Sequence, residues 1–196
     1  MKKRFICEGS LYDLKELAVD VQRLLDQNVS LYKESNKAYK SLAVLIGFLR
    51  ALKVIHTAHH WQASGEPYYA DHLLFERLAA PLEGEVDVIA EKVVGANEKV
   101  LTNFFVQHEH TKNFLNFISE GKSLEEESLR AEQVFVVAAE LVMDELENKN
   151  ALTRGIEQAL GNILDKHEGH LYLLNARASN PLLKDNQDSL PSSPTT

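Results

Sequence analysis

Apolar residues recur at intervals of three and four along most of the chain between Leu11 and Ser179, and glycine and proline are scarce there. This spacing matches the period of an α-helix that turns one apolar face toward a core. The pattern therefore predicts an all-α fold.

Local breaks in this pattern mark where each helix begins and ends. The segment "QASGEP" interrupts the first long apolar stripe, and Pro67 suits the first turn of the helix that follows. "GAN" ends that second helix, "GKSLEEES" is a polar connection, and "NKN" separates the last two helices. The predicted helices cover residues 41–61, 68–94, 129–147 and 151–178, with short helical pieces over 98–120. Four long helices, with a short connector helix between the second and third, predict a four-helix bundle.

Three regions are expected along the chain. Residues 1–30 form an N-terminal extension that is partly helical, with an extra helix over 11–27, and residues 31–179 form the bundle. Residues 180–196 include the polar stretch "KDNQDSLPSSPTT", which has too few apolar side chains to order itself. We expect this tail to be disordered.

The composition fits one globular domain, because the chain has 196 residues and 44% of them are hydrophobic. The single cysteine, Cys7, cannot form an internal disulfide, and acidic residues follow the N-terminus too soon for a signal peptide. The longest apolar runs are interrupted by Arg50 and Lys53 or are too short, whereas a membrane helix needs about 20 residues. We therefore expect a cytoplasmic protein without a transmembrane helix.

The charge of the chain argues against nucleic acid as a partner. The formal net charge is −8, and the basic residues cluster only at Lys2, Lys3 and Arg4. Binding to phosphate needs a local basic surface. We expect DNA binding to be absent or weak.

Five potential metal ligands lie around the second predicted helix, separated by successive gaps of 12, 4, 11 and 4 residues: His60, His72, Glu76, Asp87 and Glu91. The members of each i, i+4 pair lie one helical turn apart, so each pair can present two ligands to one ion. Imidazole and carboxylate together suit iron, zinc or manganese. The alternative interpretation is a solvated helix face, on which such pairs are common.

The two i, i+4 pairs cannot bind one ion within one chain. Eleven residues of helix between Glu76 and Asp87 span about 16 Å, whereas a two-metal centre spans about 4 Å. His72 and Glu91 are centred near residue 81, and Glu76 and Asp87 share that centre. Two copies of the helix crossing antiparallel about a two-fold axis would therefore form two equivalent sites. His60, just before the loop into this helix, could add an imidazole beside His72.

This motif resembles that of the Dps family, the ferritin-like mini-ferritins named for DNA protection during starvation. In that family a His-Trp pair precedes a second histidine by twelve residues, and carboxylates follow at +4, +11 and +4. His60-Trp61, His72, Glu76, Asp87 and Glu91 match every spacing. The segment "ILDKHEGHLYLLNARA" is similar to the closing helix of the family, and the resemblance covers roughly residues 26–178.

The resemblance implies a site shared between subunits, with His60, His72 and Glu76 of one subunit facing Asp87 and Glu91 of its two-fold mate. It also implies a homo-oligomer, a dodecamer that forms a hollow shell. Ferrous iron would be oxidised at these five residues by peroxide or oxygen and stored inside as ferric mineral, which protects against oxidative stress. Zinc is a possible substitute for iron with such ligands.

The sequence departs from the family pattern in several places. Glu76 stands where the family usually has aspartate, and the basic N-terminal extension of some members is reduced to "KKR". Pro81 lies in the middle of the second predicted helix, at the expected two-fold centre, where it removes a backbone donor and predicts a kink. The alternative function is therefore a non-catalytic helical shell or scaffold protein with a degraded or zinc-occupied site.

Two histidines next to the motif are expected to have mainly structural roles. His56 lies one turn before His60, and we favour a hydrogen-bonded core position over an auxiliary ligand. His59 is interpreted as structural.

Four further histidines are interpreted as packing or surface residues. His108 and His110 are expected on the surface, and His167 and His170 are expected to pack inward in the last helix. The sequence contains no Glu-x-x-His, which argues against a di-iron site inside one bundle.

Overall fold

The computed structural model describes residues 14–33, 38–118, 121 and 123–178. Its elements are α1 (Leu14–Val29), α2 (Lys40–Gln62), α3 (Tyr68–Ala79), α4 (Leu82–Gly95), the 3-10 helix η1 (Lys99–Thr102), α5 (Phe104–Phe117), α6 (Leu124–Asn148) and α7 (Arg154–Ala178). All regular elements in this described part are helical, so the predicted all-α class is confirmed. The predicted disordered tail, Cys7 and the basic N-terminal cluster lie outside the described residues.

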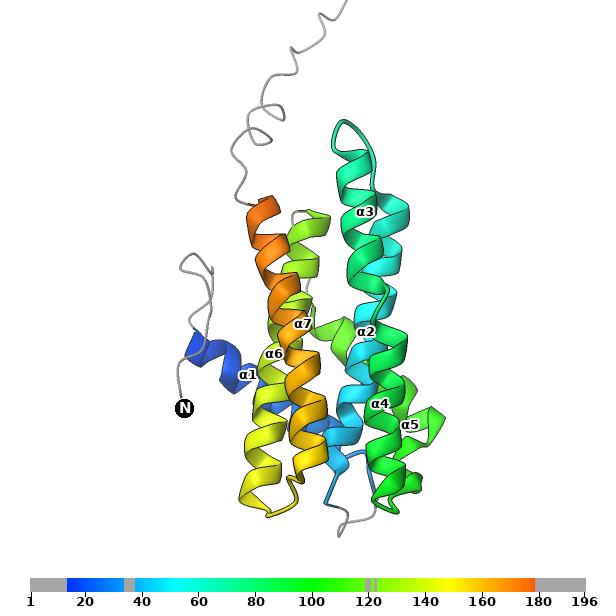
Figure 1. Cartoon of the computed structure of the whole chain (residues 1–196), viewed down its shortest axis with the longest axis vertical. Coiled ribbons are helices and arrows are strands. Elements are labelled where there is room, and N and C mark those ends of the chain that lie inside the picture. Colours follow the sequence, from blue (N-terminus) through cyan, green and yellow to red (C-terminus); the bar gives the residue numbers. More distant parts are fainter. Residues whose placement is uncertain (1–13, 34–37, 119–120, 122, 179–196) are drawn as a thin grey trace, which may run out of the picture.

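Four helical columns form the bundle, and they run along the long axis of the molecule (Figure 1). They are α2, the consecutive helices α3 and α4, α6, and α7. The connector predicted between the second and third columns is present as η1 and α5, and α5 packs against α2. Helix α1 crosses the bundle obliquely and packs on α6, α2 and α5, so the extra N-terminal helix is also present.

Helix α2 is the centre of the core. Its leucine stripe is fully buried, with Leu42, Leu45, Leu49 and Leu52 each at most 1% exposed. Among the described residues, α2 is the one helix long and apolar enough to cross a membrane, but 72% of its most apolar stretch is buried inside the bundle. Burial of this kind is expected for the core helix of a bundle.

The second column is two helices, whereas the sequence predicted one kinked helix over 68–94. Helix α3 ends at Ala79 and α4 begins at Leu82, with Pro81 between them. Proline has no N–H to donate to the carbonyl of Arg77, so the helical ladder is interrupted there. The backbone of Pro81 keeps helical angles, φ −77° and ψ −20°, so the column continues past the break.

The third and fourth columns differ from their predicted bounds at the N-terminal ends. Helix α6 starts at Leu124, five residues before the predicted Leu129, because the Ser123 side chain accepts a hydrogen bond from Glu126 N at 3.2 Å. Helix α7 starts at Arg154, three residues after the predicted start, where the Thr153 hydroxyl accepts from Ile156 N at 3.3 Å. Apolar periodicity locates a buried face, whereas capping residues fix the first turn.

Helix α5 approaches α2 very closely at Gly47. A Cβ atom on Gly47 would lie 2.4 Å from Cβ of His110, so only glycine fits this contact. His110 is 0% exposed, and the prediction that it lies on the surface is therefore wrong, whereas His108 is exposed as predicted. Burial lowers the pKa of His110 to about 4, so its ring is neutral at pH 7.

Candidate metal centre

Four helices bring ionisable side chains together inside the bundle. The cluster consists of His56 from α2, Glu85 from α4, Glu132 from α6, and His167 and His170 from α7. His56, Glu132 and His167 are 0% exposed, Glu85 is 2% exposed, and His170 is 6% exposed. Such groups are rarely buried unless they are paired or bind a metal.

Helical periodicity explains why these residues meet. His56 continues the buried leucine stripe of α2, and His167 and His170 continue the stripe of α7 that begins at Ile156. Glu132 falls within the buried run of α6, between Ala131 and Gln133. The polar residues therefore occupy positions at which the helical pattern demands a side chain in the core.

Glu132 is the hub of the cluster, because three imidazoles contact its carboxylate. Its Oε1 lies 2.8 Å from His56 Nε2 and 3.1 Å from His170 Nδ1, and its Oε2 lies 2.5 Å from His167 Nδ1. One ligand atom from each of Glu132, His167 and His170 lies within 4.8 Å of the others, which is close enough for all three to hold one ion.

Glu85 links this hub to the surface of α7. Its Oε2 accepts a hydrogen bond from His167 Nε2 at 3.1 Å, and its Oε1 accepts one from the Lys166 ammonium at 3.1 Å. The Lys166 side chain is about half exposed, at 51%. The Lys166 ammonium therefore lies between solvent and the Glu85 carboxylate. That carboxylate is hydrogen-bonded to Nε2 of His167, the ring nitrogen that does not contact Glu132.

A second chain of polar groups leaves the hub through α2 and α6. His56 Nδ1 lies 3.2 Å from Ser128 Oγ, which in turn lies 2.8 Å from His59 Nδ1. His59 Nε2 contacts Glu127 Oε2 at 3.0 Å, and the Glu127 side chain is 28% exposed. His56 is thus a hydrogen-bonded core histidine, as the sequence predicted, and His59, which was interpreted as structural, is hydrogen-bonded in the core as well.

Within the cluster, Glu132 and His167 each shift the pKa of the other toward the charged form. Burial alone would lower the pKa of His167, but the charge of Glu132 and hydrogen bonds to Glu132 and Glu85 raise it to about 9. Burial would raise the pKa of Glu132, and the charge of His167 with the imidazole hydrogen bonds holds that pKa well below its ordinary value. Burial lowers the pKa of His56 and of His59, although hydrogen bonds to Glu132 and Glu127 oppose it.

The five residues predicted from sequence lie elsewhere, on the outer side of α2, α3 and α4. His60 and His72 are brought together, with ring centroids 3.7 Å apart and planes inclined by 27°. His60 Nδ1 donates to the carbonyl of His72 at 2.9 Å, and His72 Nδ1 donates to the carbonyl of His60 at 3.1 Å. Since carbonyl oxygens only accept, both Nδ1 atoms carry a proton, so in the neutral form of each ring the lone pair is on Nε2.

The side chains of the three predicted carboxylates do not contact this histidine pair. Glu76, on α3, and Asp87 and Glu91, on α4, are exposed. Within the described part of the chain, none of their carboxylates makes a hydrogen bond or an ion pair. Whether they complete a site with the histidines of a second copy stays a prediction.

The buried carboxylates Glu85 and Glu132 were not predicted, and His167 and His170 were predicted only to pack in the core. The absence of Glu-x-x-His does not exclude a site inside the bundle, because α7 contributes His-x-x-His instead. A usable signal was present: a glutamate within the apolar run "AEQVFVVAA" occupies a core position that only a partnered charge tolerates.

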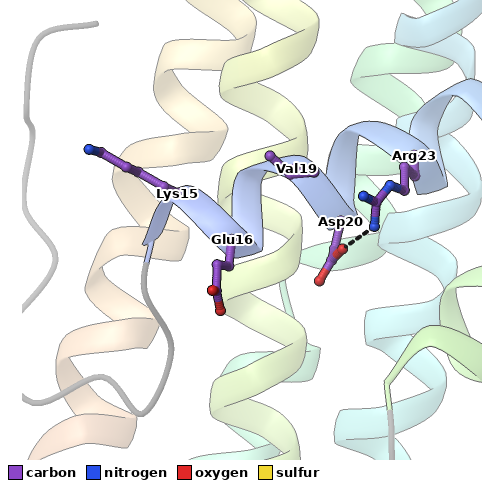
Figure 2. A pocket seen from close by; sticks show the side chains of 5 residues that line it. All are labelled: Lys15, Glu16, Val19, Asp20 and Arg23. Atoms are coloured by element: carbon purple, nitrogen blue, oxygen red, sulfur yellow. Dashed lines mark hydrogen bonds and ion pairs between the residues drawn. The ribbon is translucent and has the colours of Figure 1, made fainter.

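The hollow in Figure 2 is a different kind of feature. It lies along α1 and is lined by Lys15, Glu16, Val19, Asp20 and Arg23, all from one helix. An ion pair of 2.8 Å joins Asp20 and Arg23 across it. These residues lie on the solvent side of α1 and provide no converging groups from a second element, so this hollow is not a candidate site.

The arrangement defines a ferritin-like bundle, and comparison with solved structures identifies the fold as that of Dps proteins. The chain is similar to Dps from Thermosynechococcus elongatus, with a TM-score of 0.62, 13% identity, and coverage of 82% of this chain and 96% of that one. It is also similar to the Dps protein from Vibrio cholerae O1, described as a member of a broad superfamily of ferritin-like diiron-carboxylate proteins. That match has a TM-score of 0.60, 14% identity, and coverage of 83% and 92%. No protein-family model and no curated protein sequence matches the chain.

Proposed function

We propose that this protein is a Dps-like mini-ferritin that binds and oxidises ferrous iron and stores the ferric product. The observation that carries the proposal is the buried cluster around Glu132, which lies in the centre of a ferritin-like bundle. Two imidazoles of α7 and one carboxylate of α6 converge there within ligand distance of a single ion. A mixed nitrogen and oxygen donor set suits iron, zinc and manganese.

The chemistry that the cluster offers follows from its donors. Carboxylate charge favours the ferric over the ferrous state, because it compensates the extra positive charge of the oxidised ion. Iron here is the substrate, and each ferrous ion gives one electron to the oxidant. Hydrogen peroxide takes two electrons and two protons to become two molecules of water, so each peroxide molecule oxidises two ferrous ions. Consuming peroxide and ferrous iron together explains protection against oxidative stress.

A second candidate site is the outer set of His60, His72, Glu76, Asp87 and Glu91, completed between two copies of the chain. The observation that favours it is the reciprocal hydrogen bonding of His60 and His72, which leaves both Nε2 atoms free to bind an ion. A ligating histidine typically donates its other ring N–H to a carbonyl or carboxylate in this way. The two sites share no residue, so both can be present in one chain.

The assembly and location are part of the same proposal. By analogy with the Dps fold, a dodecameric shell encloses the mineral, its two-fold interfaces hold the outer site, and the protein works in the cytoplasm. The net charge of −8 supports an iron store that does not need DNA contact. The alternative is a non-catalytic helical shell or scaffold whose metal sites hold zinc.

The test is anaerobic addition of ferrous iron and then peroxide, with ferric absorbance and particle mass followed together. Glu132→Gln should slow oxidation if the buried cluster acts, whereas Glu140→Gln, the same change at an exposed position of α6, should not. His72→Ala should slow it if the outer set acts, with the exposed His108→Ala as its control. An assembled wild-type shell that leaves iron oxidation unaccelerated contradicts the proposal and favours the scaffold.

A further inference from the structure

We infer that Lys53 is a positioning residue for the outer metal site proposed between two copies of the chain. Its ammonium holds the C-terminal end of α3 on α2, next to the point where Pro81 interrupts the second column. The inference rests on the proposed function, because the outer set of ligands is its second candidate site. Lys53 is not one of the five predicted ligands, so its role would be to hold their helix in place.

Lys53 joins two helices that pack against each other, α2 and α3. Its half-buried side chain donates a hydrogen bond from Nζ to the carbonyl oxygen of Ala79 at 2.9 Å. Ala79 is the last residue of α3. The last carbonyls of a helix lack partners within the helix and carry partial negative charge, so a cation is favoured there. The contact is therefore a charge-assisted hydrogen bond that binds the end of α3 to α2.

The interruption at Pro81 explains why this carbonyl is open to Lys53. In a continuous helix the carbonyl of Ala79 would accept from the N–H of Glu83, four residues further on. Here α3 ends at Ala79 and α4 begins only at Leu82. Proline removes a donor from the helical ladder and crowds the turn before it. The carbonyl at the break is therefore held by a side chain of α2.

A second contact ties the other end of α3 to α2 in the same register. His60 and His72 each donate from Nδ1 to the main-chain carbonyl of the other. Lys53 lies seven residues before His60 on α2, and Ala79 lies seven residues after His72 on α3. Seven residues are about two helical turns, so both contacts lie on the facing sides of this antiparallel pair. Helix α3 is thus fixed to α2 at both of its ends.

The helix fixed in this way carries part of the outer set. Glu76 lies on α3 between the two contacts, whereas Asp87 and Glu91 lie on α4, beyond the break. In the two-fold arrangement, ligands on α3 of one copy meet ligands on α4 of the other. The angle between α3 and α4 therefore sets how closely the ligands approach. The break at Pro81 frees this angle, and Lys53 fixes it by holding α3 on the helix against which α4 also packs.

The experiment measures cobalt binding to the assembled protein, since Co²⁺ takes the place of iron and its visible absorption depends on its ligands. The part of the binding that is lost in His72→Ala belongs to the outer site. Lys53→Met, which removes the donor and keeps the length of the side chain, should weaken that part on the order of tenfold. Lys53→Arg keeps a cationic donor and should bind cobalt like the unmodified protein. Arg50→Met, the loss of a cation at an exposed position of α2, is the matched control.

The background of Pro81→Ala separates positioning from general stability. Alanine restores the N–H at residue 81 and allows one continuous helix, in which the carbonyl of Ala79 accepts from Glu83. Lys53→Met should then have little effect on cobalt affinity, whereas a role in stability alone would give the same loss in both backgrounds. Amide hydrogen exchange in the last turn of α3 should accelerate in Lys53→Met and not in Arg50→Met.

The outcomes distinguish failure of the inference from failure of the proposed function. Cobalt binding that depends on His72 but is unchanged in Lys53→Met overturns the inference and leaves the proposed iron oxidation intact. Equal weakening in Arg50→Met, or an equal loss in the Pro81→Ala background, overturns it as well. If Lys53→Met does not assemble, unaccelerated hydrogen exchange in α3 overturns the inference. Absence of any cobalt binding that depends on His72 removes the outer site and the inference together, and iron oxidation by the same protein decides the function separately.

Discussion

His60 and His72 each donate their Nδ1 proton to the main-chain carbonyl oxygen of the other, at 2.9 and 3.1 Å. The two donations tie the last turn of α2 to α3 across the "QASGEP" loop and stack the rings at 3.7 Å. The two half-buried rings are therefore held in fixed positions relative to each other. His60 and His72 are the two imidazoles of the site that the sequence motif predicts between subunits.

Mixed assemblies of two inactive variants should recover part of any activity at the outer site. His72→Ala removes the histidine side of each site and Glu91→Ala the carboxylate side. In a two-fold dimer of unlike chains, one site carries both changes and the other carries neither. Random mixing makes about half of the dimers unlike, so about a quarter of the outer sites should be intact. Iron oxidation measured after co-refolding, in a Glu132→Gln background that silences the buried cluster, checks this.

The control for that mixture is each variant refolded alone at the same total concentration. Recovery no greater than the average of the two separate variants would show that the ligands are not shared. The particle mass must match that of the unmodified protein in every sample, so that failure to assemble is not mistaken for loss of the site.

The metal-free protein should lose stability as the pH rises above neutrality, because His167 loses its proton. Its pKa in the fold is about 9, against an ordinary 6.5. A raised pKa contributes stability that is complete below pH 6.5 and is lost as the pH rises through about 9. The difference corresponds to on the order of 3 kcal/mol of unfolding free energy. Urea unfolding in the presence of a chelator, at about pH 6 and about pH 9.5, measures it.

Comparison with His167→Gln shows whether His167 causes this dependence of stability on pH. The variant should be less stable at pH 6 and should show a smaller fall toward pH 9.5, whereas His108→Gln, at an exposed histidine of α5, should behave like the unmodified protein. Equal falls in the unmodified protein and in His167→Gln would contradict the role of the His167 and Glu132 pair. Acid should also destabilise the fold, since the lowered pKa of Glu132 contributes stability that is lost as the pH falls.

The fold could be predicted from the sequence because apolar periodicity is a local signal. The stripe through Leu42, Leu45 and Leu49 and the scarcity of glycine and proline located the long helices. Their first turns were less predictable, since Ser123 and Thr153 act through single hydrogen bonds that periodicity does not register. Pro81 predicted an interruption, but whether the helix bends or ends there depends on the packing around it.

The buried cluster was harder to predict, because it joins residues far apart in the chain. His59 and His60 are neighbours, yet His59 faces inward to Ser128 and Glu127 while His60 faces outward to His72. The outer set, by contrast, was predicted from regular spacing along the sequence. Glu132 meets His56 and His167 only after α2, α6 and α7 have packed, and no spacing in the sequence encodes that contact.

The ion pair between Asp71 and Arg177 should contribute clearly to stability, because it holds the C-terminal end of α7 on α3. Arg177 Nε and a terminal nitrogen lie 2.6 and 3.0 Å from the two Asp71 oxygens, and the side chains are 17% and 7% exposed. Arg177→Gln leaves the Asp71 carboxylate largely buried without its partner, at a cost of about 2–3 kcal/mol. Arg154→Gln, at the solvent-exposed start of the same helix, should change little. Urea unfolding measures both, and a double-mutant cycle with Asp71→Asn that shows no coupling would contradict the pairing.

Two glycine-to-alanine changes in helices should have opposite effects on stability. At Gly47 the new Cβ atom would lie 2.4 Å from Cβ of His110 and 3.1 Å from the backbone of α5, so α5 must shift away from α2. Overpacking of this kind costs about 1–3 kcal/mol. At Gly161, in α7, nothing lies within 4 Å of the new atom, so the higher helix propensity of alanine should stabilise by about 1 kcal/mol. Thermal unfolding of both variants checks the prediction, and a Gly47→Ala protein at least as stable as Gly161→Ala would show that α5 does not pack against α2 at this point.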